Sequence, residues 1–506
     1  MRSLPSCLLV AAVVVSIGAP AAQAQVPEPD NDPFYAVPVG IGALADGSIL
    51  DSRQIQPVAL GIPLRARAWQ VKFKTVDNQA RATATVTTVL VPFAAWQGPG
   101  PRPLLSYQAA EDGVGTRCAP SYGLRAGLVT ANSNAGNETL LIALALQEGW
   151  TVAAPDYEGP RSQFLGVTAG SHGVLDGIRA ARAFKPAGIS ASAPVGLWGY
   201  SGGALATSWA AQLQAEQAPE LRFAGVALGG VTADLKATFK AFNGGPAGGA
   251  VAVALVGLDR SYPEADIPQY LNAAGRRLLV DGSKDCLADA VVRHPLLDIA
   301  DYESKPNIIE DPAFSALLTR SSSLGVPGTP TAPVYAYTAE ADEFAPIGPA
   351  RRLVARYCAA GVPVQQVVDP VGEHVTELAL GAQGAIGYLR DRFAGKPIPD
   401  TCPPGSRAEA AATHAVAARY VLSVSPAHPR AGTRTRTRFT FTARRRQGGR
   451  LRVVSGAIVH FAHRAARTTS TGHATIFATL PRAHRRERAR LVVHGQTVAE
   501  RFVPVR

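Results

Sequence analysis

The stretch Gly199-Tyr200-Ser201-Gly202-Gly203 decides the fold that this sequence predicts. The apolar segment Val195–Trp198 precedes it, and the helix-forming run Ala204–Ala206 follows. This order predicts a strand, a tight turn and a helix, with Ser201 in the turn and glycines relieving the crowding around it. The Ser201 hydroxyl is then exposed at the carboxyl edge of a sheet, and the Gly202 N–H points toward a developing oxyanion. The alternative is a glycine-rich turn without chemistry.

A nucleophilic serine needs a base. His374 follows the predicted strand 364–368, where a chain ordered serine, acid, histidine has its base. We interpret His172 and His294 as surface or capping residues. An exposed histidine without a catalytic role is the alternative for His374.

The base in turn needs an acid to orient it. Asp342 follows the predicted strand 334–338 and has Pro346 four residues later, so it fits a polar turn at a strand end. Glu340 and Glu343 are the nearby alternatives. A second oxyanion donor is expected in the loop 110–113, where no motif selects one residue.

Strand and helix patterns alternate along most of the chain. This alternation predicts an α/β fold with a mostly parallel sheet that is covered on both faces. It is interrupted between about residues 231 and 325 by apolar helical segments, which we interpret as a lid; a purely stabilising helical subdomain is the alternative. We predict strands at 81–93, 104–107, 151–154, 195–198, 223–228, 334–338 and 364–368, and helices at 140–147, 172–184, 202–213 and 377–393.

Charge divides the 506 residues into two parts. The hydrophobic share of 47% excludes a disordered chain, and the formal net charge is +12. That charge comes from the segment after Cys402, which contains 20 Arg, no Lys and three acidic residues, whereas acidic residues outnumber basic ones in the preceding part. We therefore predict a main domain at 25–402, a linker at 403–417 and a basic module at 418–506.

The N-terminus has the pattern of a secretory signal peptide. Arg2 precedes the apolar run 8–17, and the small residues of Ala22-Gln23-Ala24 close it. We expect cleavage after Ala24 and a secreted, extracellular or surface-associated protein. Four cysteines remain after cleavage, which predicts two disulfides with three possible connectivities: Cys118, Cys286, Cys358 and Cys402.

The basic module has the texture of a small antiparallel β-sandwich. Seven short segments alternate with period two between turn residues, as in immunoglobulin-like modules of exported bacterial proteins. Its arginines suggest an anionic lipid surface or the cell envelope as partner. Nucleic acid is disfavoured because few aromatic residues stand among the arginines and export removes most such partners.

Taken together, several motifs resemble the secretory lipase family of yeasts and actinobacteria. The resemblance covers about residues 32–402. The matching segments are Asp32–Tyr35, Leu105–Gln108 with Glu111-Asp112, Cys118–Tyr122, Leu175–Ala180, Gly199–Ala204, Phe242–Pro246 and Glu373–Thr376.

This resemblance implies an α/β-hydrolase fold with a helical lid. It implies a catalytic triad of Ser201, Asp342 and His374, and oxyanion donors at Asp112 and Gly202. It also implies the disulfides Cys118–Cys286 and Cys358–Cys402. The basic module has no counterpart in the yeast pattern.

We expect a secreted serine carboxylic-ester hydrolase, most simply a triacylglycerol lipase that acts on a lipid or ester substrate through an acyl-enzyme. No metal or organic cofactor is implied. A short-chain esterase or a peptidase on the same fold is one alternative. A non-catalytic protein that binds envelope polymers is the other. The sequence does not decide the acyl-chain preference or the oligomeric state.

Overall fold

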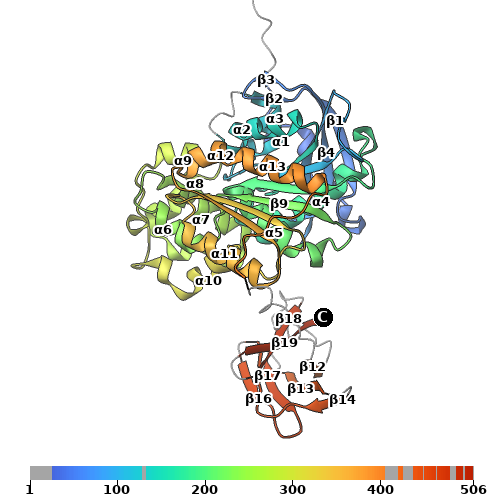
Figure 1. Ribbon diagram of the computed structural model, residues 1–506. Coiled ribbons are helices and arrows are strands. Elements are labelled where there is room, and N and C mark those ends of the chain that lie inside the picture. The colour runs from blue at the N-terminus through green and yellow to red at the C-terminus, as the bar shows by residue number, and fades with distance from the viewer. Residues whose placement is uncertain are drawn as a thin grey trace, which may run out of the picture. The chain divides into compact units, whose positions relative to one another are not determined.

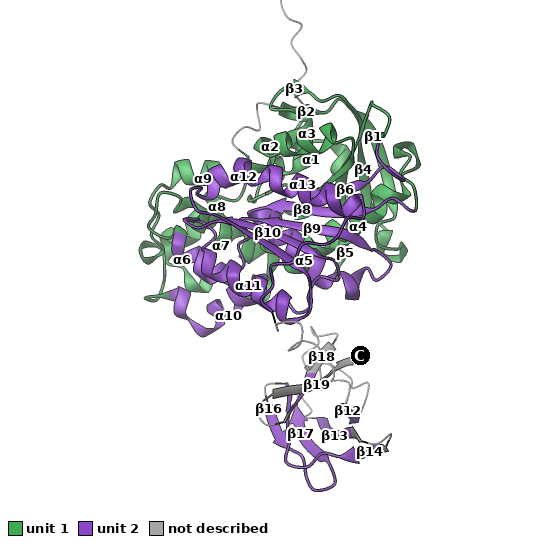
Figure 2. Ribbon diagram, viewed as in Figure 1, with its two compact units in different colours: residues 1–97, 109–191, 242–307 green, residues 98–108, 192–241, 308–506 purple. Residues whose placement is uncertain are grey.

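The computed structural model describes residues 26–127 and 133–404, and in the C-terminal part 420–425, 437–447, 450–462, 464–478, 486–493 and 496–504. The chain forms two compact units (Figure 2). Unit 1 comprises residues 1–97, 109–191 and 242–307, and unit 2 comprises 98–108, 192–241 and 308–506. The expected signal peptide and nearly all of the expected linker lie outside the described residues.

Unit 1 contains antiparallel strands, where the sequence predicted a mostly parallel sheet. The strands follow one another in the order β1 (Ile49–Ile55), β4 (Ala66–Val76), β5 (Ala82–Pro92) and β7 (Thr151–Pro155), and each pair is antiparallel. Between β4 and β5 the reason is a short connection, in which the Asp77 carboxylate accepts N–H groups of the turn and reverses the chain. The sequence prediction of a mostly parallel sheet did not specify these antiparallel pairs, and the mixed strand directions are consistent with it.

Helices pack against the strands of unit 1. The longest is α4 (Val167–Ala183), which contacts β4, β5 and β7. The others in this part of the chain are α1 (Pro120–Ala126), α2 (Asn134–Asn137) and α3 (Thr139–Gln147).

Unit 2 contains the parallel strands that the sequence predicted. Each of these strands is parallel to its neighbour, and β8 (Val195–Tyr200) is buried along its whole length. Helices α5 (Gly202–Gln217), α11 (Ile347–Ala359) and α13 (Ala382–Phe393) pack on them (Figure 1). The strand order is β6 (Leu104–Gln108), β8 (Val195–Tyr200), β9 (Phe223–Gly229), β10 (Val334–Ala339) and β11 (Val364–Asp369).

The interrupting segment 231–325 is helical, as its apolar pattern indicated. This segment contains no β-strand. Its use as a lid stays a prediction. Its helices are α6 (Leu235–Phe242), α7 (Gly249–Ser261), α8 (Ala273–Asp281), α9 (Leu287–Arg293) and α10 (Pro312–Ser321).

The C-terminal residues form two small antiparallel sheets. They share one hydrophobic core that includes Phe439, Phe441 and Phe461. Strand β16 was not among the seven predicted segments, and the immunoglobulin-like assignment stays a prediction. One sheet contains β12 (Tyr420–Ser425), β13 (Thr437–Gln447), β14 (Arg450–Val453) and β17 (His473–Ala478), and the other contains β15 (Ile458–Phe461), β16 (Arg464–Arg467), β18 (Arg486–Val493) and β19 (Gln496–Pro504).

Two disulfides link distant parts of the sequence. Cys118 is bonded to Cys286 within unit 1, and Cys358 to Cys402 within unit 2. This is the pairing that the family resemblance implied. Among the described residues, no helix is both long and apolar enough to span a bilayer.

Candidate active site

Ser201 occupies a sharp turn between strand β8 and helix α5. Its φ of 51° lies in the left-handed region, which a non-glycine residue seldom adopts. The turn is held because the Ser201 N–H donates to the Gly229 carbonyl at 2.9 Å and the Ser201 carbonyl accepts the Leu205 N–H at 3.0 Å. Gly199 is required beside it, because a Cβ there would lie 2.3 Å from the Gly203 carbonyl oxygen. The strand, turn and helix predicted from the pentapeptide are all present.

Three side chains of unit 2 form a hydrogen-bonded chain. The His374 Nε2 lies 2.8 Å from the Ser201 Oγ, and the His374 Nδ1 lies 2.9 and 2.8 Å from the two carboxylate oxygens of Asp342. With its proton on Nδ1, the imidazole donates to Asp342 and leaves Nε2 free to accept the serine proton. Asp342 and His374 are both buried. The Asp342 carboxylate is fixed further by the N–H groups of Phe344 and Ala345, at 3.1 and 2.6 Å.

The two glutamates near Asp342 have other partners. Glu343 accepts the backbone N–H of His374 at 3.1 Å, and Glu340 forms an ion pair with Arg351 at 2.6 Å. Neither contact involves the imidazole ring. Of the three acids that the sequence left open, the ring nitrogen contacts Asp342.

His374 begins helix α12 (His374–Leu380), one turn before a buried acid that the sequence did not single out. Glu377 is only 1% exposed. Burial raises its pKa to about 7, and the nearby carboxylates of Asp369 and Asp342 add to this effect. Backbone N–H groups of Val371 and Gly372 lower the pKa of Asp369, so below about pH 7 Asp369 carries the negative charge and Glu377 the proton. Only the spacing of Glu377 from His374, one helical turn, is visible in the sequence.

The two expected oxyanion donors lie in different units. Gly202 is the first residue of α5, where an N–H has no acceptor within the helix. Asp112 belongs to unit 1, is 5% exposed and has a positive φ of 34°. Its carbonyl accepts the Leu287 N–H at 2.8 Å, and its carboxylate accepts from Asn134 at 2.9 Å. Asp112 is thus held firmly in a rare backbone conformation, and its role as a donor stays a prediction.

A cluster of buried acids also lies in unit 1. The Ser121 N–H and hydroxyl donate to the Asp156 carboxylate at 2.9 and 2.5 Å, and the Glu111 carboxylate accepts the Glu158 N–H at 3.4 Å. Burial raises the pKa of Asp156 to about 7 and also raises those of Glu111 and Glu158. No sequence motif indicates this cluster, because its members come from two separate segments of the sequence.

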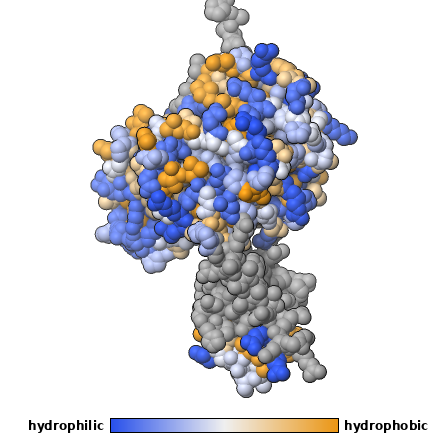
Figure 3. Space-filling model, in the orientation of Figure 1, coloured by the Kyte–Doolittle hydropathy of each residue, from blue (hydrophilic) through white to orange (hydrophobic). Residues whose placement is uncertain are grey.

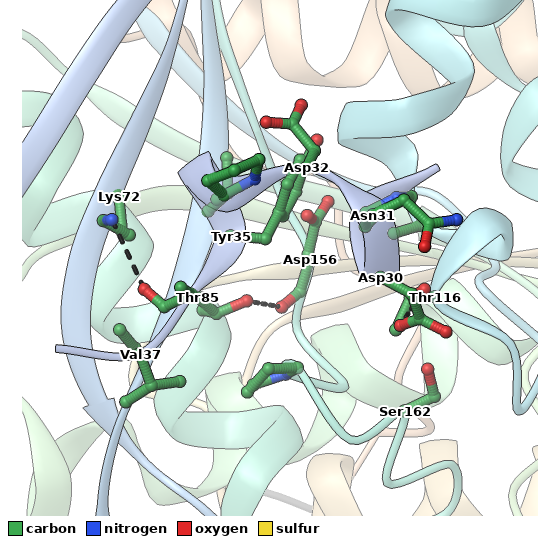
Figure 4. Close-up of a pocket in the computed structure, with 18 residues that line it drawn as sticks. Asp30, Asn31, Asp32, Tyr35, Val37, Lys72, Thr85, Thr116, Asp156 and Ser162 are labelled. Atoms are coloured by element: carbon green, nitrogen blue, oxygen red, sulfur yellow. Dashed lines mark hydrogen bonds between the residues drawn. The ribbon is translucent and has the colours of Figure 1, made fainter. Parts of the chain in front are cut away.

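Asp156 also lines a cavity of about 420 Å³ in unit 1. Figure 4 shows the Thr85 hydroxyl hydrogen-bonded to the Asp156 carbonyl in the middle of the lining, with Lys72 to one side and Thr116 and Ser162 to the other. Ser201, Asp342 and His374 do not line it.

One group of side chains has the proximity of metal ligands. The ligand atoms of Asp46, His172 and Asp176 lie within 4.8 Å of one another. Their carboxylates already contact cations, because Lys74 pairs with Asp46 and Arg179 lies 2.6 Å from Asp176. We therefore interpret the group as an ion-pair network, with His172 a half-buried member of it.

Comparisons with known proteins identify the family of this chain. A model of the secretory lipase family matches residues 124–401. The chain belongs to the secretory lipase family.

Its relatives include a protein named as a probable inactive lipase and a protein named as a triacylglycerol lipase. The chain is 38% identical over 378 residues to a probable inactive lipase of Mycobacterium tuberculosis, covering 74% of this chain and 84% of the relative. It is 33% identical over 387 residues to a secreted triacylglycerol lipase of Malassezia furfur, covering 74% of this chain and 82% of the relative.

The fold also has a solved counterpart. The X-ray structure of Candida antarctica lipase A matches with a TM-score of 0.68 and 31% identity, covering 77% of this chain and 94% of that lipase. The predicted α/β-hydrolase fold and the predicted family are thereby confirmed. Family and fold together support an ester hydrolase.

Proposed function

We propose that this member of the secretory lipase family is a secreted triacylglycerol lipase that works through an acyl-enzyme. The observation that carries the proposal is the continuous chain from the Ser201 Oγ through the His374 ring to the Asp342 carboxylate, at 2.8 Å and 2.8–2.9 Å. Each residue type and distance in this chain suits a nucleophile, a general base and an orienting acid.

In the proposed acylation step, the Ser201 Oγ attacks the ester carbonyl while the His374 Nε2 takes its proton. Asp342 stabilises the imidazolium that forms. The Gly202 and Asp112 N–H groups stabilise the negative charge that develops on the carbonyl oxygen. His374 then gives the proton to the leaving alkoxide, the carbon–oxygen bond of the ester breaks, and the acyl group remains on Ser201.

Deacylation uses the same residues in reverse. His374 takes a proton from water, the hydroxide attacks the acyl carbonyl, and Ser201 leaves with the proton that His374 returns. A fatty acid is released and the free enzyme is restored. In this proposal the apolar helical segment 231–325 acts as a lid that opens at a lipid surface.

Hydrolysis of p-nitrophenyl esters across a series of acyl chains tests the proposal. We expect activity that rises with chain length and falls at least about 10⁴-fold in Ser201→Ala. Ser52→Ala, at an exposed position of β1, is the matched control. A fluorophosphonate probe should transfer its phosphonyl group, with loss of fluoride, to the peptide that contains Ser201.

Other outcomes separate the alternatives. Activity confined to acetate and butyrate esters would identify a short-chain esterase. An inert wild type that also fails to react with the probe would place the chain beside its relative named as inactive, and would favour an envelope-binding protein.

We further propose that the basic module holds the secreted enzyme at an anionic surface. The arginine excess after Cys402 supports this role, and the family name and the secreted fungal relative support export. Because the attraction is electrostatic, high salt should release the protein from such a surface.

A further inference from the structure

One face of the β12-β13-β14-β17 sheet presents arginines to solvent. Every second residue of β13 from Phe439 to Ala443 is buried in the core of the module. Because side chains alternate between the two faces of a strand, Arg438 and Arg444 lie on the opposite face. Both are exposed.

Apolar side chains stand beside these arginines on the same face. The strand register pairs Arg438 with Phe477 and Arg444 with Val453, and directly paired residues of neighbouring strands point to the same side. Leu451 is two residues from Val453 and shares its face. Leu451, Val453 and Phe477 are 45%, 51% and 45% exposed.

We call Arg438, Arg444, Leu451, Val453 and Phe477 the β13 face. On the described surface of the module, hydrophilic and hydrophobic residues are indeed exposed next to one another (Figure 3). Hydroxyl side chains of Thr440, Thr442 and Thr475 fill the positions between them in the register.

The sheet that carries the β13 face has no acidic residue in its four strands. The two acids of the module, Glu487 and Glu500, belong to strands β18 and β19 of the other sheet. The β13 face is therefore complementary to a negatively charged surface, and no carboxylate of its own sheet opposes the attraction.

We propose that the β13 face docks the enzyme on an anionic phospholipid bilayer. This inference rests on the proposed function, in which the module retains the enzyme at an anionic surface, and it names the surface and the residues. The aliphatic side chains favour a bilayer over an anionic sugar polymer, because Leu451 and Val453 enter the boundary between head groups and acyl chains. Arg438 and Arg444 then donate to lipid phosphates.

Sedimentation of the full chain with vesicles tests the docking face. The Ser201→Ala background prevents hydrolysis, and the vesicles are phosphatidylcholine with or without phosphatidylglycerol. Each cationic side chain near such a surface contributes about fivefold in affinity. We therefore expect Arg438→Gln/Arg444→Gln to weaken binding to the anionic vesicles about 10- to 25-fold and to leave binding to pure phosphatidylcholine unchanged.

A matched pair on the other sheet provides the control. Arg464 and Arg467 are exposed residues of β16, and replacing both by Gln removes the same charge. We expect a clearly smaller loss from this pair. Phe477→Ser should weaken binding to anionic vesicles severalfold even in high salt, because the contribution it removes is apolar.

Three results would overturn the proposal. They are an equal loss in the Arg464/Arg467 pair, wild-type binding that does not depend on phosphatidylglycerol, and β13-face variants that bind vesicles normally but lose affinity for an anionic polysaccharide. Hydrolysis of soluble p-nitrophenyl butyrate by the same variants with Ser201 intact should match the wild type. Absence of that activity in the wild type would contradict the proposed function and leave the docking measurement unaffected.

Discussion

The Tyr200 hydroxyl donates a 2.6 Å hydrogen bond to the backbone carbonyl of His374. Tyr200 ends strand β8 directly before Ser201, and its ring also lies 5.2 Å from the imidazole. The residue that precedes the proposed nucleophile therefore holds the proposed base in position. The variable position of the pentapeptide thus acts on the geometry of the site.

Replacing Tyr200 by Phe removes this bond and keeps the ring. A buried hydrogen bond contributes about 1 kcal/mol, so we expect kcat for a p-nitrophenyl ester to fall about fivefold while KM changes little. Tyr335→Phe, in strand β10, which β9 separates from β8, is the matched control and should keep kcat. Equal effects of the two substitutions would mean that Tyr200 contributes only to packing.

The acids at positions 342 and 343 should differ sharply in their effect on rate. Asp342→Asn leaves the His374 ring without a carboxylate partner and should lower kcat by about 10⁴-fold. Glu343→Gln keeps an acceptor for the His374 backbone N–H and should change kcat less than about tenfold. Single-turnover kinetics of both variants checks the prediction, and a larger loss in Glu343→Gln would assign the orienting role to Glu343.

The buried acids of unit 1 should make the protein less stable as the pH rises. Burial raises the pKa of Asp156 to about 7, well above its unfolded value. The folded state therefore binds more protons than the unfolded state. The contribution of the protonated Asp156 to stability is complete below about pH 4 and is lost as the pH rises through about 7. Glu111 and Glu158, with raised pKa values, act in the same direction.

Thermal unfolding between about pH 5 and pH 8 measures this effect. We expect Tm to fall with rising pH and the slope to become shallower in Asp156→Asn, which keeps an acceptor for Ser121 and does not titrate. Asp51→Asn, at an exposed position of β1, is the control and should leave the slope unchanged. A Tm that rises over this range would show that the cluster is ionised in the folded protein.

The two disulfides should contribute differently to stability. They join residues 168 and 44 positions apart, so the chain-entropy model assigns them about 5 and about 4 kcal/mol. We expect Cys118→Ser/Cys286→Ser to lower the urea midpoint more than Cys358→Ser/Cys402→Ser does. The reverse order would mean that contacts in the native state, and not loop length, set the two contributions.

Local patterns were enough to predict the centre of the fold. The turn at Ser201 depends on residues next to it, and strand β8 is a continuous apolar run because both of its faces are covered. Strand β4 gave no such signal because it contains Lys72 and Lys74, which are only 6% exposed each. Lys72 donates to the Phe34 carbonyl at 2.9 Å, a partner that the local sequence does not reveal.

Contacts between distant segments account for the rest. The sequence predicted one closing helix from residue 377, whereas the structure has α12 and α13 with a break at Gly381. A Cβ at Gly381 would lie 2.2 Å from the ring of Tyr337, a residue of strand β10 that is distant in the sequence. The acid cluster was invisible for the same reason, because Glu111 and Asp156 meet only in the folded chain.

The bond between Cys118 and Cys286 closes a covalent ring that contains Ser201. A protease that cuts once in the helical segment between Phe242 and Cys286 therefore produces two fragments that remain one molecule. The fragment with Ser201 and the fragment with His374 stay tethered until a reductant opens the ring. For the secreted enzyme that we propose, a single cut in this segment would thus leave the two fragments joined, and it would show as a band that separates into two only on a reducing gel.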